Sequence, residues 1–168
     1  MEKEIVNRVT NSQLITFDLE DYYPDGERVS FDISKWLYEG IVLKEKDFRT
    51  FAESHDWSQY TNNFVALGCS TDAIIPGWAY LLLTIKLSPF AKKVTVGSLE
   101  DLEVLIYSEI ILDLPLESFK DKPLIIKGCS NKSIPAAAYV LLVQRFQPVA
   151  KSIMYGEACS SVPLYRKK

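Results

Sequence analysis

An internal repeat in the second half of the chain limits the possible folds more than any other feature of the sequence. Residues 64–97 and 124–156 can be aligned with Asp72 left out as a one-residue gap, and 13 of the 33 aligned positions are then identical. The shared positions include a Gly-Cys-Ser triplet, an Ile-Pro pair and a final Gly. Identity at this level predicts one structural unit that is present twice.

Each copy has the pattern of a β-α-β unit. An apolar run typical of a buried strand leads into the Gly-Cys-Ser turn, a proline follows where a helix can begin, and a second apolar run comes after the helix. The expected strands are residues 65–67, 93–96, 124–126 and 152–155. The expected helices are residues 78–87 and 137–146, after Pro76 and Pro135. The sequence therefore predicts an α/β fold with a mostly parallel sheet, helices on both faces, and the two β-α-β copies within it.

The remaining segments give weaker signals. Ser98 and Asp101 form a variant of the capping box, which predicts a helix that joins the two copies. Asp32 is placed to cap a helix. The other expected elements are strands at residues 14–19 and 41–43 and helices at residues 34–39 and 47–54.

Composition restricts the class of protein. The chain has 168 residues, 48% hydrophobic and 24% charged, and a formal net charge of −3. These values are typical of a globular protein and exclude a disordered chain, a collagen and a coiled coil. A sequence pI near 5.3 argues against a nucleic-acid partner bound through a basic face. No linker or change in composition divides the chain, so residues 1–168 are expected to form one domain.

The sequence also favours a cytoplasmic protein without a membrane partner. Residues 1–4 have mixed charge and no apolar stretch follows them, so a signal peptide is not expected. The most apolar run, residues 78–85, is too short to cross a membrane. An odd number of cysteines without a secretion signal is typical of a reducing compartment.

The three cysteines form the candidate site. The carboxyl ends of parallel strands lie at one edge of a sheet, where α/β proteins bind their ligands. Cys69, Cys129 and Cys159 each follow a predicted strand closely and are expected at that edge. If the strand order is 2-1-3-4, Cys69 and Cys129 follow neighbouring strands about 4.8 Å apart, whereas the order 1-2-3-4 separates them by about 10 Å. We favour the first order because each helix can then cover a different face.

Three converging thiols predict a metal or sulfur-handling site. They could hold zinc with a fourth ligand, or three corners of an iron–sulfur cluster. The serine after each cysteine (Ser70, Ser130 and Ser160) could donate a hydrogen bond to bound sulfur or to an anion. Two alternatives stay open: the cysteines are small core residues of a non-catalytic protein-interaction module, or one of them is the nucleophile of a thiol-dependent enzyme.

Other polar groups have simpler interpretations. His55 is the only histidine and is expected at the C-terminal end of a helix, as a capping residue. Asp18, Glu20 and Asp21 lie at the end of the first predicted strand, either as a cation site or, more simply, as a solvated strand end. The sequence contains no Rossmann fingerprint, phosphate-binding loop or nucleophile elbow.

The chain resembles a small bacterial family, the domain of unknown function number 2480, in five segments: LITFDLEDYYP, LKEKDFR, HDWSQY, CSTDAIIPGWAYLLL and PVAKSIMYGEACSSVPLY. The resemblance covers nearly the whole chain and implies no activity. Members of this family are often encoded near iron–sulfur assembly genes, so the resemblance implies iron–sulfur assembly proteins as partners. Neither the oligomeric state nor a catalytic residue is predicted.

Overall fold

The computed structural model describes residues 13–128, 131–157 and 159–168. Contacts between residues divide the chain into two compact units. The terminal unit contains the chain up to Tyr23 and from Ser108 onward, and the middle unit contains Pro24–Tyr107. Helices and strands alternate along the chain, so the expected α/β class is confirmed. The single-domain organisation stays a prediction.

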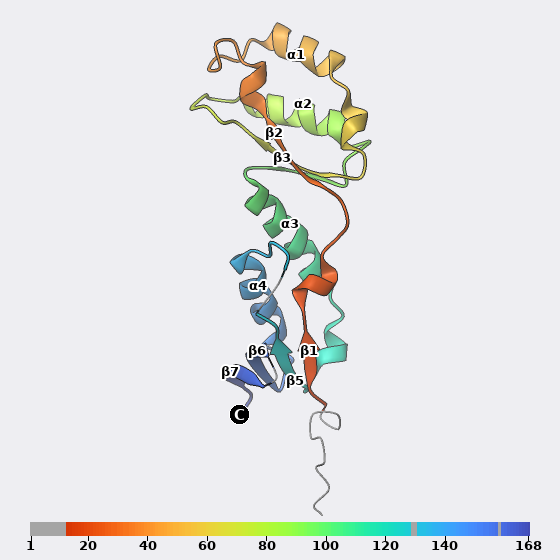
Figure 1. The fold of residues 1–168 in the computed structure, drawn as a ribbon, viewed down its shortest axis with the longest axis vertical. Coiled ribbons are helices and arrows are strands. Elements are labelled where there is room, and N and C mark those ends of the chain that lie inside the picture. Colours follow the sequence, from red (N-terminus) through yellow and green to blue (C-terminus); the bar gives the residue numbers. More distant parts are fainter. Residues whose placement is uncertain (1–12, 129–130, 158) are drawn as a thin grey trace, which may run out of the picture. The chain divides into compact units, whose positions relative to one another are not determined.

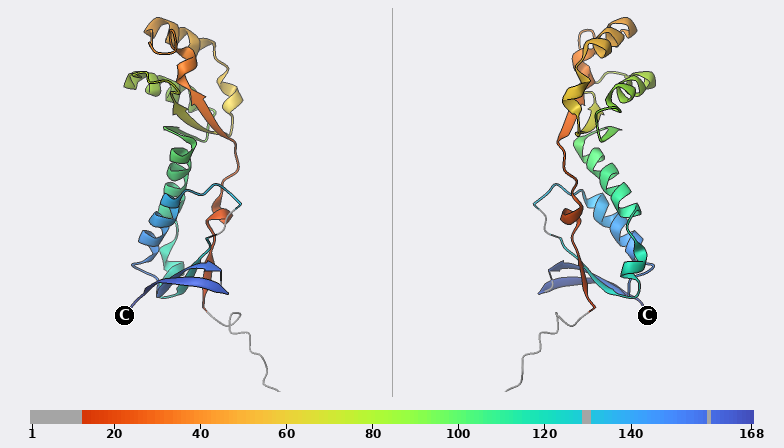
Figure 2. Two further views of the ribbon diagram at one scale, coloured as in Figure 1. Left: turned by 60° about the vertical axis from the view of Figure 1, so that its left-hand side comes forward. Right: turned by 90° about the vertical axis from the view of Figure 1, so that its right-hand side faces the viewer.

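The terminal unit is built on a mixed sheet (Figure 1). Its strands are β1 (Ile15–Phe17), β5 (Pro123–Ile126), β6 (Ser152–Glu157) and β7 (Ser160–Arg166). They lie in the order β1-β5-β6-β7, with β1, β5 and β6 parallel and β7 antiparallel to β6. Helix α4 (Ala136–Phe146) connects β5 to β6. The ring of Phe17 packs edge-on against Phe146 with centroids 5.1 Å apart, so α4 covers one face of this sheet (Figure 2).

The middle unit is built on a parallel sheet in the order β2-β3-β4. Its strands are β2 (Arg28–Asp32), β3 (Phe64–Gly68) and β4 (Lys93–Val96). Its helices are α1 (Glu45–Ser54) and α2 (Gly77–Leu87), together with the first residues of α3 (Leu99–Leu112). Short 3-10 helices, Ile33–Trp36 and Trp57–Tyr60, precede α1 and β3.

Helices cover both faces of the three-stranded sheet. Phe31 of β2 belongs to a core cluster with residues of β3, α1 and α2. Successive side chains of a strand point to opposite faces, so Arg28 faces the other way. There its guanidinium Nε donates to Glu103 of α3 at 2.6 Å. This pair is largely buried, with side-chain exposures of 11% and 6%.

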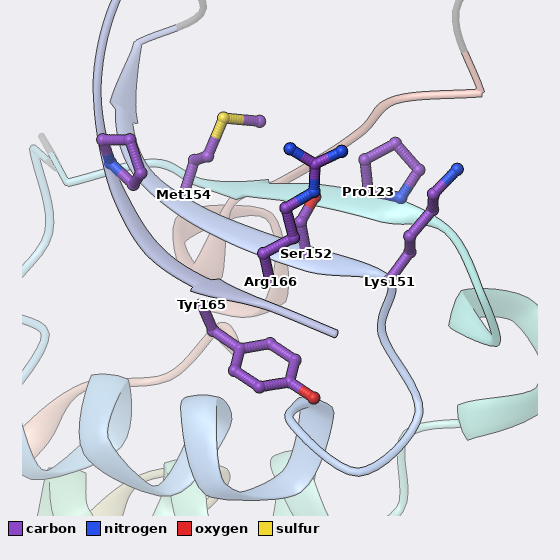
Figure 3. Close-up of a pocket in the computed structure, with 7 residues that line it drawn as sticks. Pro123, Lys151, Ser152, Met154, Tyr165 and Arg166 are labelled. Carbon is purple, nitrogen blue, oxygen red and sulfur yellow. The ribbon is translucent and has the colours of Figure 1, made fainter. Parts of the chain in front are cut away.

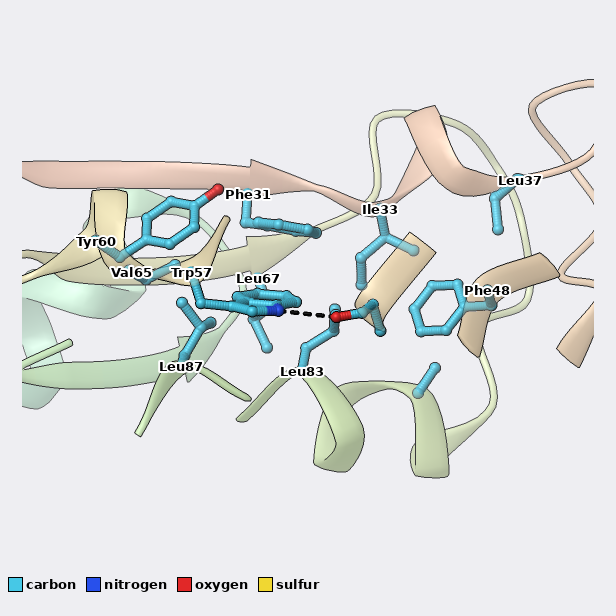
Figure 4. Packing of buried hydrophobic residues seen from close by; sticks show 12 residues of the cluster. Phe31, Ile33, Leu37, Phe48, Trp57, Tyr60, Val65, Leu67, Leu83 and Leu87 are labelled. Atoms are coloured by element: carbon cyan, nitrogen blue, oxygen red, sulfur yellow. Dashed lines mark hydrogen bonds between the residues drawn. The ribbon is translucent and has the colours of Figure 1, made fainter. Parts of the chain in front are cut away.

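Aromatic and aliphatic side chains fill the core of the middle unit (Figure 4). The cluster contains Phe31, Ile33, Leu37, Phe48, Ala52, Trp57, Tyr60, Val65, Leu67, Ala79, Leu83 and Leu87. The buried indole N–H of Trp57 donates to the carbonyl of Ala52 at 2.9 Å, which leaves no unpaired polar hydrogen on that ring.

Most elements of the repeat form where the sequence predicts them. The structure confirms all four strands of the two copies and both of their helices within one or two residues. The capping box of α3 also forms. The amide of Ser98 donates to Asp101 Oδ2 at 2.7 Å, and the amide of Asp101 donates to Ser98 Oγ at 3.2 Å.

Residues outside the repeat depart from prediction in several places. Residues 41–43 form no strand, because the chain reverses at Gly40 (φ 73°) and only an isolated bridge joins Tyr38 to Val42. The helix expected at residues 34–39 is limited to the 3-10 helix Ile33–Trp36, which Asp32 caps as predicted. Strands β2 and β7 were not predicted, because both contain exposed polar residues.

The expected strand order is wrong. Strand β3 lies in the three-stranded sheet and β5 in the four-stranded sheet, so Cys69 and Cys129 do not follow neighbouring strands. The physical reason is that the N-terminal third of the chain adds one strand beside each copy of the repeat. Strand β2 pairs with β3 of the first copy, and β1 pairs with β5 of the second copy. Each copy thus completes its own sheet.

Strands β1 and β2 are also equivalent to each other, so the duplicated structure is larger than the sequence repeat. Phe17 pairs with Ile126 of β5, and Phe31 pairs with Leu67 of β3. An aspartate follows each phenylalanine, and its side chain caps a 3-10 helix. The duplicated structure is therefore a strand, an aspartate-capped turn and a β-α-β unit.

Strand pairing also corrects the alignment of the two copies. The same number of residues separates Leu67 from Pro76 as separates Ile126 from Pro135, and these residues are structurally equivalent. The copies therefore correspond without the one-residue gap, and their Gly-Cys-Ser triplets are displaced by one position.

Gly128 consequently occupies the position of Cys69. A side chain at Gly128 would collide with the ring of Tyr155, whose hydroxyl donates to the Gly128 carbonyl at 3.4 Å. The close approach of this tyrosine requires a glycine in the terminal unit, a constraint that does not apply to Cys69.

The packing of His55 predicts a pH dependence of stability. Burial lowers the pKa of its imidazole from 6.5, although the charge of Asp56 opposes the shift. The unfolded chain therefore binds the proton more tightly, and the free energy of unfolding should decrease as the pH falls through 6.5. Urea unfolding between pH 7.5 and 5.5 measures this decrease, and the His55→Gln variant should lose part of it. An NMR titration of the single histidine with a pKa at or above 6.5 would contradict the prediction.

Candidate functional site

Among the residues that the structure describes, two of the predicted cysteines lie in different compact units. Cys69 follows β3 in the middle unit, and Cys159 lies in the turn between β6 and β7 of the terminal unit. Cys129 and Ser130 lie outside the described residues. In the described parts of the chain, no group of three His, Cys, Asp or Glu side chains could hold a metal ion. The three-cysteine site stays a prediction.

Cys69 lies at the expected carboxyl edge of its sheet. Its Sγ is 3.4 Å from the hydroxyl oxygen of Thr71, and this hydroxyl donates to the carbonyl of Gly40 at 2.6 Å. Because the hydroxyl proton is used in that bond, the thiol is the donor to Thr71. The Cys69 thiol therefore has a structural partner in Thr71.

Asp32 is the centre of the polar contacts at this edge. Its carboxylate accepts the amide of Ser34 at 3.0 Å, the amide of Ser70 at 3.0 Å and the hydroxyl of Ser70 at 2.7 Å. The Ser70 hydroxyl bond is the main cause that lowers the pKa of Asp32 to about 2, while partial burial acts in the opposite direction. Since Ser70 donates to Asp32, Ser34 donates in turn to Ser70 at 2.9 Å.

This carboxylate is therefore a clamp between strands. It caps the turn after β2 and fixes the loop after β3, and three donors already occupy it. A carboxylate with so low a pKa is a poor general base at neutral pH. The hollow beside it measures about 230 Å³, lined by Ser30, Asp32, Gly68, Cys69 and Ser70. That is below the usual range for small-molecule pockets, roughly 300–1,000 Å³.

Apolar side chains are exposed at the same edge. Ile74 lies on the loop after β3 and is 92% exposed, and Ile41 lies on the loop before α1 and is 57% exposed. The bond from Thr71 to the Gly40 carbonyl joins these two loops. We define the apolar edge as the exposed hydrophobic residues Tyr38, Ile41, Val42 and Ile74 of these loops. This surface was not predicted, although the sequence contains a signal for it: an Ile-Ile pair directly before Pro76, in a loop too short to bury both side chains.

The duplication indicates that this exposure is not required by the fold. Counted from the equivalent prolines, the terminal unit has Ser133 where the middle unit has Ile74. Both loops lead into a helix of the same length. The loop can therefore form with a polar residue at this position. Its conformation does not explain why an exposed isoleucine is present in the middle unit.

The other polar side chains considered as candidate site residues contact groups of the protein itself. His55 ends α1 as predicted, and its Nε2 lies 3.0 Å from the hydroxyl of Tyr60. Asp18 accepts the amide of Glu20 and the ammonium of Lys127, at 2.9 and 2.7 Å. Burial would raise the pKa of Asp18, but its bond with Lys127 leaves this pKa lowered.

Two further residues bear on the predicted sites. The Glu20 carboxylate accepts the amide of Asn131 at 3.0 Å, so this acidic segment has protein partners. Ser160 is exposed at the start of β7.

None of the helices in the described residues is long and apolar enough to cross a membrane.

A family model described as "Protein of unknown function (DUF2480)" matches residues 3–167. No curated protein and no solved structure matches the chain. The family description names no activity, so the geometry alone has to indicate a function.

Removal of the Asp32 carboxylate should destabilise the protein. Asp32→Ala loses a helix cap and the bonds to Ser70, and we expect a loss of about 1–2 kcal/mol in the free energy of unfolding at pH 7. Urea unfolding measures this loss. Because the folded-state pKa is lowered, the contribution should be present above pH 3.8 and disappear as the pH falls towards 2.

Asp56→Ala is the matched control. Asp56 also caps a 3-10 helix, but its carboxylate bonds only Ser58 among the described residues and joins no strands. Its loss should be smaller. An equal effect of the two substitutions would show that Asp32 acts as a cap only.

Proposed function

The chain belongs to DUF2480, a family of proteins of unknown function, and we propose that it is a non-catalytic binding module that docks a partner protein on the apolar edge. The observation that carries this proposal is the 92% exposure of Ile74 on a loop held by hydrogen bonds. Burial of such a side chain in an interface contributes roughly 1.5–3 kcal/mol.

The loop that carries Ile74 is suited to docking because it is ordered before a partner binds. Ser70 is bonded to Asp32 of the neighbouring strand, and Thr71 is bonded to the loop that carries Ile41. Pro76 restricts the end of the loop. Little conformational entropy would be lost on binding, which favours affinity.

The polar groups nearby support binding over catalysis. The Asp32 carboxylate is occupied by three donors, the Cys69 thiol donates to Thr71, and the only imidazole of the chain packs among aromatic rings. Groups that could act as base or nucleophile thus have structural partners. A metal or sulfur site of the three cysteines, and iron–sulfur assembly proteins as its partners, stay predictions.

The Ile74→Ser variant tests the proposal, because serine is the residue that the duplicated loop carries. We expect the wild-type chain to retain a specific protein from a lysate of its natural host, and the purified complex to weaken roughly tenfold to a hundredfold in Ile74→Ser. Leu81→Ser is the matched control, since Leu81 is 66% exposed on α2, outside the loops that form the apolar edge.

Three results bear on the proposal. A partner that is lost with Ile74→Ser and kept with Leu81→Ser supports it, provided that circular dichroism shows both variants folded. A partner that binds both variants equally contradicts docking at the apolar edge. The absence of any protein whose retention depends on Ile74 contradicts it as well.

A further inference from the structure

The terminal unit contains a second surface feature, a hollow of about 330 Å³ on its sheet. Apolar groups line one part of it, chiefly Pro123, Met154 and Pro163. Lys151 and Arg166 line the other part, with Ser152 beside them. Figure 3 shows the side chains of Met154, Arg166, Lys151 and Pro123 projecting from the same side of the sheet. The hollow therefore combines cations with an apolar floor.

Strand pairing fixes the position of both cations. Pro123 of β5 pairs with Ser152 of β6, and Ser152 pairs with Arg166 of β7. The backbone of Lys151 is bonded on both sides, because its amide donates to the Lys122 carbonyl and its carbonyl accepts the amide of Lys167, each at 2.9 Å. Lys151 and Arg166 thus lie at one end of a hydrogen-bonded sheet.

The charged side chains of Lys151 and Arg166 have no hydrogen bond or salt bridge with any residue that the structure describes. Neighbouring lysines differ, because the Lys122 ammonium donates to the Ser118 carbonyl and the Lys167 ammonium pairs with Asp121 at 2.8 Å. The bond from Lys167 is the main cause of the lowered pKa of Asp121, and the charge of Lys151 contributes least. The acid near Lys151 is thus already paired.

The duplicated unit provides an internal comparison for Lys151. Lys92 stands at the equivalent position before β4, and its amide donates to the carbonyl of Asn63 just as Lys151 donates to Lys122. The Lys92 ammonium, however, donates to the Asp25 carbonyl at 2.5 Å. It also lies 5.6 Å from the centre of the Phe64 ring. The Lys92 ammonium therefore has partners within the middle unit, whereas the Lys151 ammonium of the terminal unit is available to a ligand.

We propose that this hollow binds a small organic anion, with its carboxylate or phosphate group held by Lys151 and Arg166 and its apolar body against Met154 and the two prolines. A guanidinium and an ammonium together suit either oxyanion. The volume is at the lower end of the range for small-molecule pockets, so the ligand is small. A net charge of −3 disfavours a polyanion such as a nucleic acid.

Titration of the purified ¹⁵N-labelled full chain tests the proposal without any partner protein, so its outcome is independent of docking at the apolar edge. The probes are phenyl phosphate, benzoate and benzyl alcohol, which share a ring and differ in the charged group. We expect saturable shifts of the amides of β6 and β7 with at least one anion and none with the alcohol. The tighter of the two anions identifies phosphate or carboxylate as the natural group.

Substitutions locate the binding. Arg166→Gln and Lys151→Gln should each weaken binding at least roughly tenfold, as expected for one charge-assisted hydrogen bond. Lys92→Gln is the matched control and should leave the affinity unchanged. Failure of both anions to saturate at roughly 10 mM, equal binding of the alcohol, or equal effects of Lys92→Gln and Lys151→Gln would overturn the proposal.

Discussion

The fold depends on the contacts of one aspartate in each unit, which lies at the end of the first strand of that unit. Strands β1 and β2 pair with strands that follow much later in the sequence, and β1 is separated from β5 by the entire middle unit. Asp32 joins its strand to Ser70, and Asp18 joins its strand to Lys127. Each carboxylate also caps the next turn. One charged group thus links a local turn to a distant strand, which offsets the entropy of closing a long loop.

Local signals explain which parts of the fold could be predicted. The β-α-β copies have apolar runs, prolines and a capping box whose meaning does not depend on distant residues, and these elements form as expected. The strand order was not predictable in this way, because it depends on β1 and β2. Strand β2 alternates the polar residues Arg28, Ser30 and Asp32 with apolar residues. The contact of the largely buried Arg28 with Glu103 is a tertiary effect that the sequence does not display.

The candidate surfaces could not be predicted from the residues that the two copies share. The shared Gly-Cys-Ser triplets are not structurally equivalent, since the ring of Tyr155 requires Gly128 where the other copy has Cys69. The informative positions are those at which the copies differ. Ile74 is exposed where the other loop has serine, and the charge of Lys151 is available where the other unit satisfies its lysine. After a duplication, the two copies can keep the same strands and helices while their surface residues diverge. Each copy can then acquire its own binding surface.

We conclude that the Asp32 carboxylate holds two neighbouring strands together and is not a reactive group. Native-state hydrogen exchange of the Ser70 amide tests it most directly, because this amide donates to the carboxylate from outside any strand. We expect protection of the Ser70 amide similar to that of the β3 amides, with selective loss of this protection in Asp32→Ala. Exchange of the wild-type Ser70 amide at the rate of an unstructured peptide would contradict it.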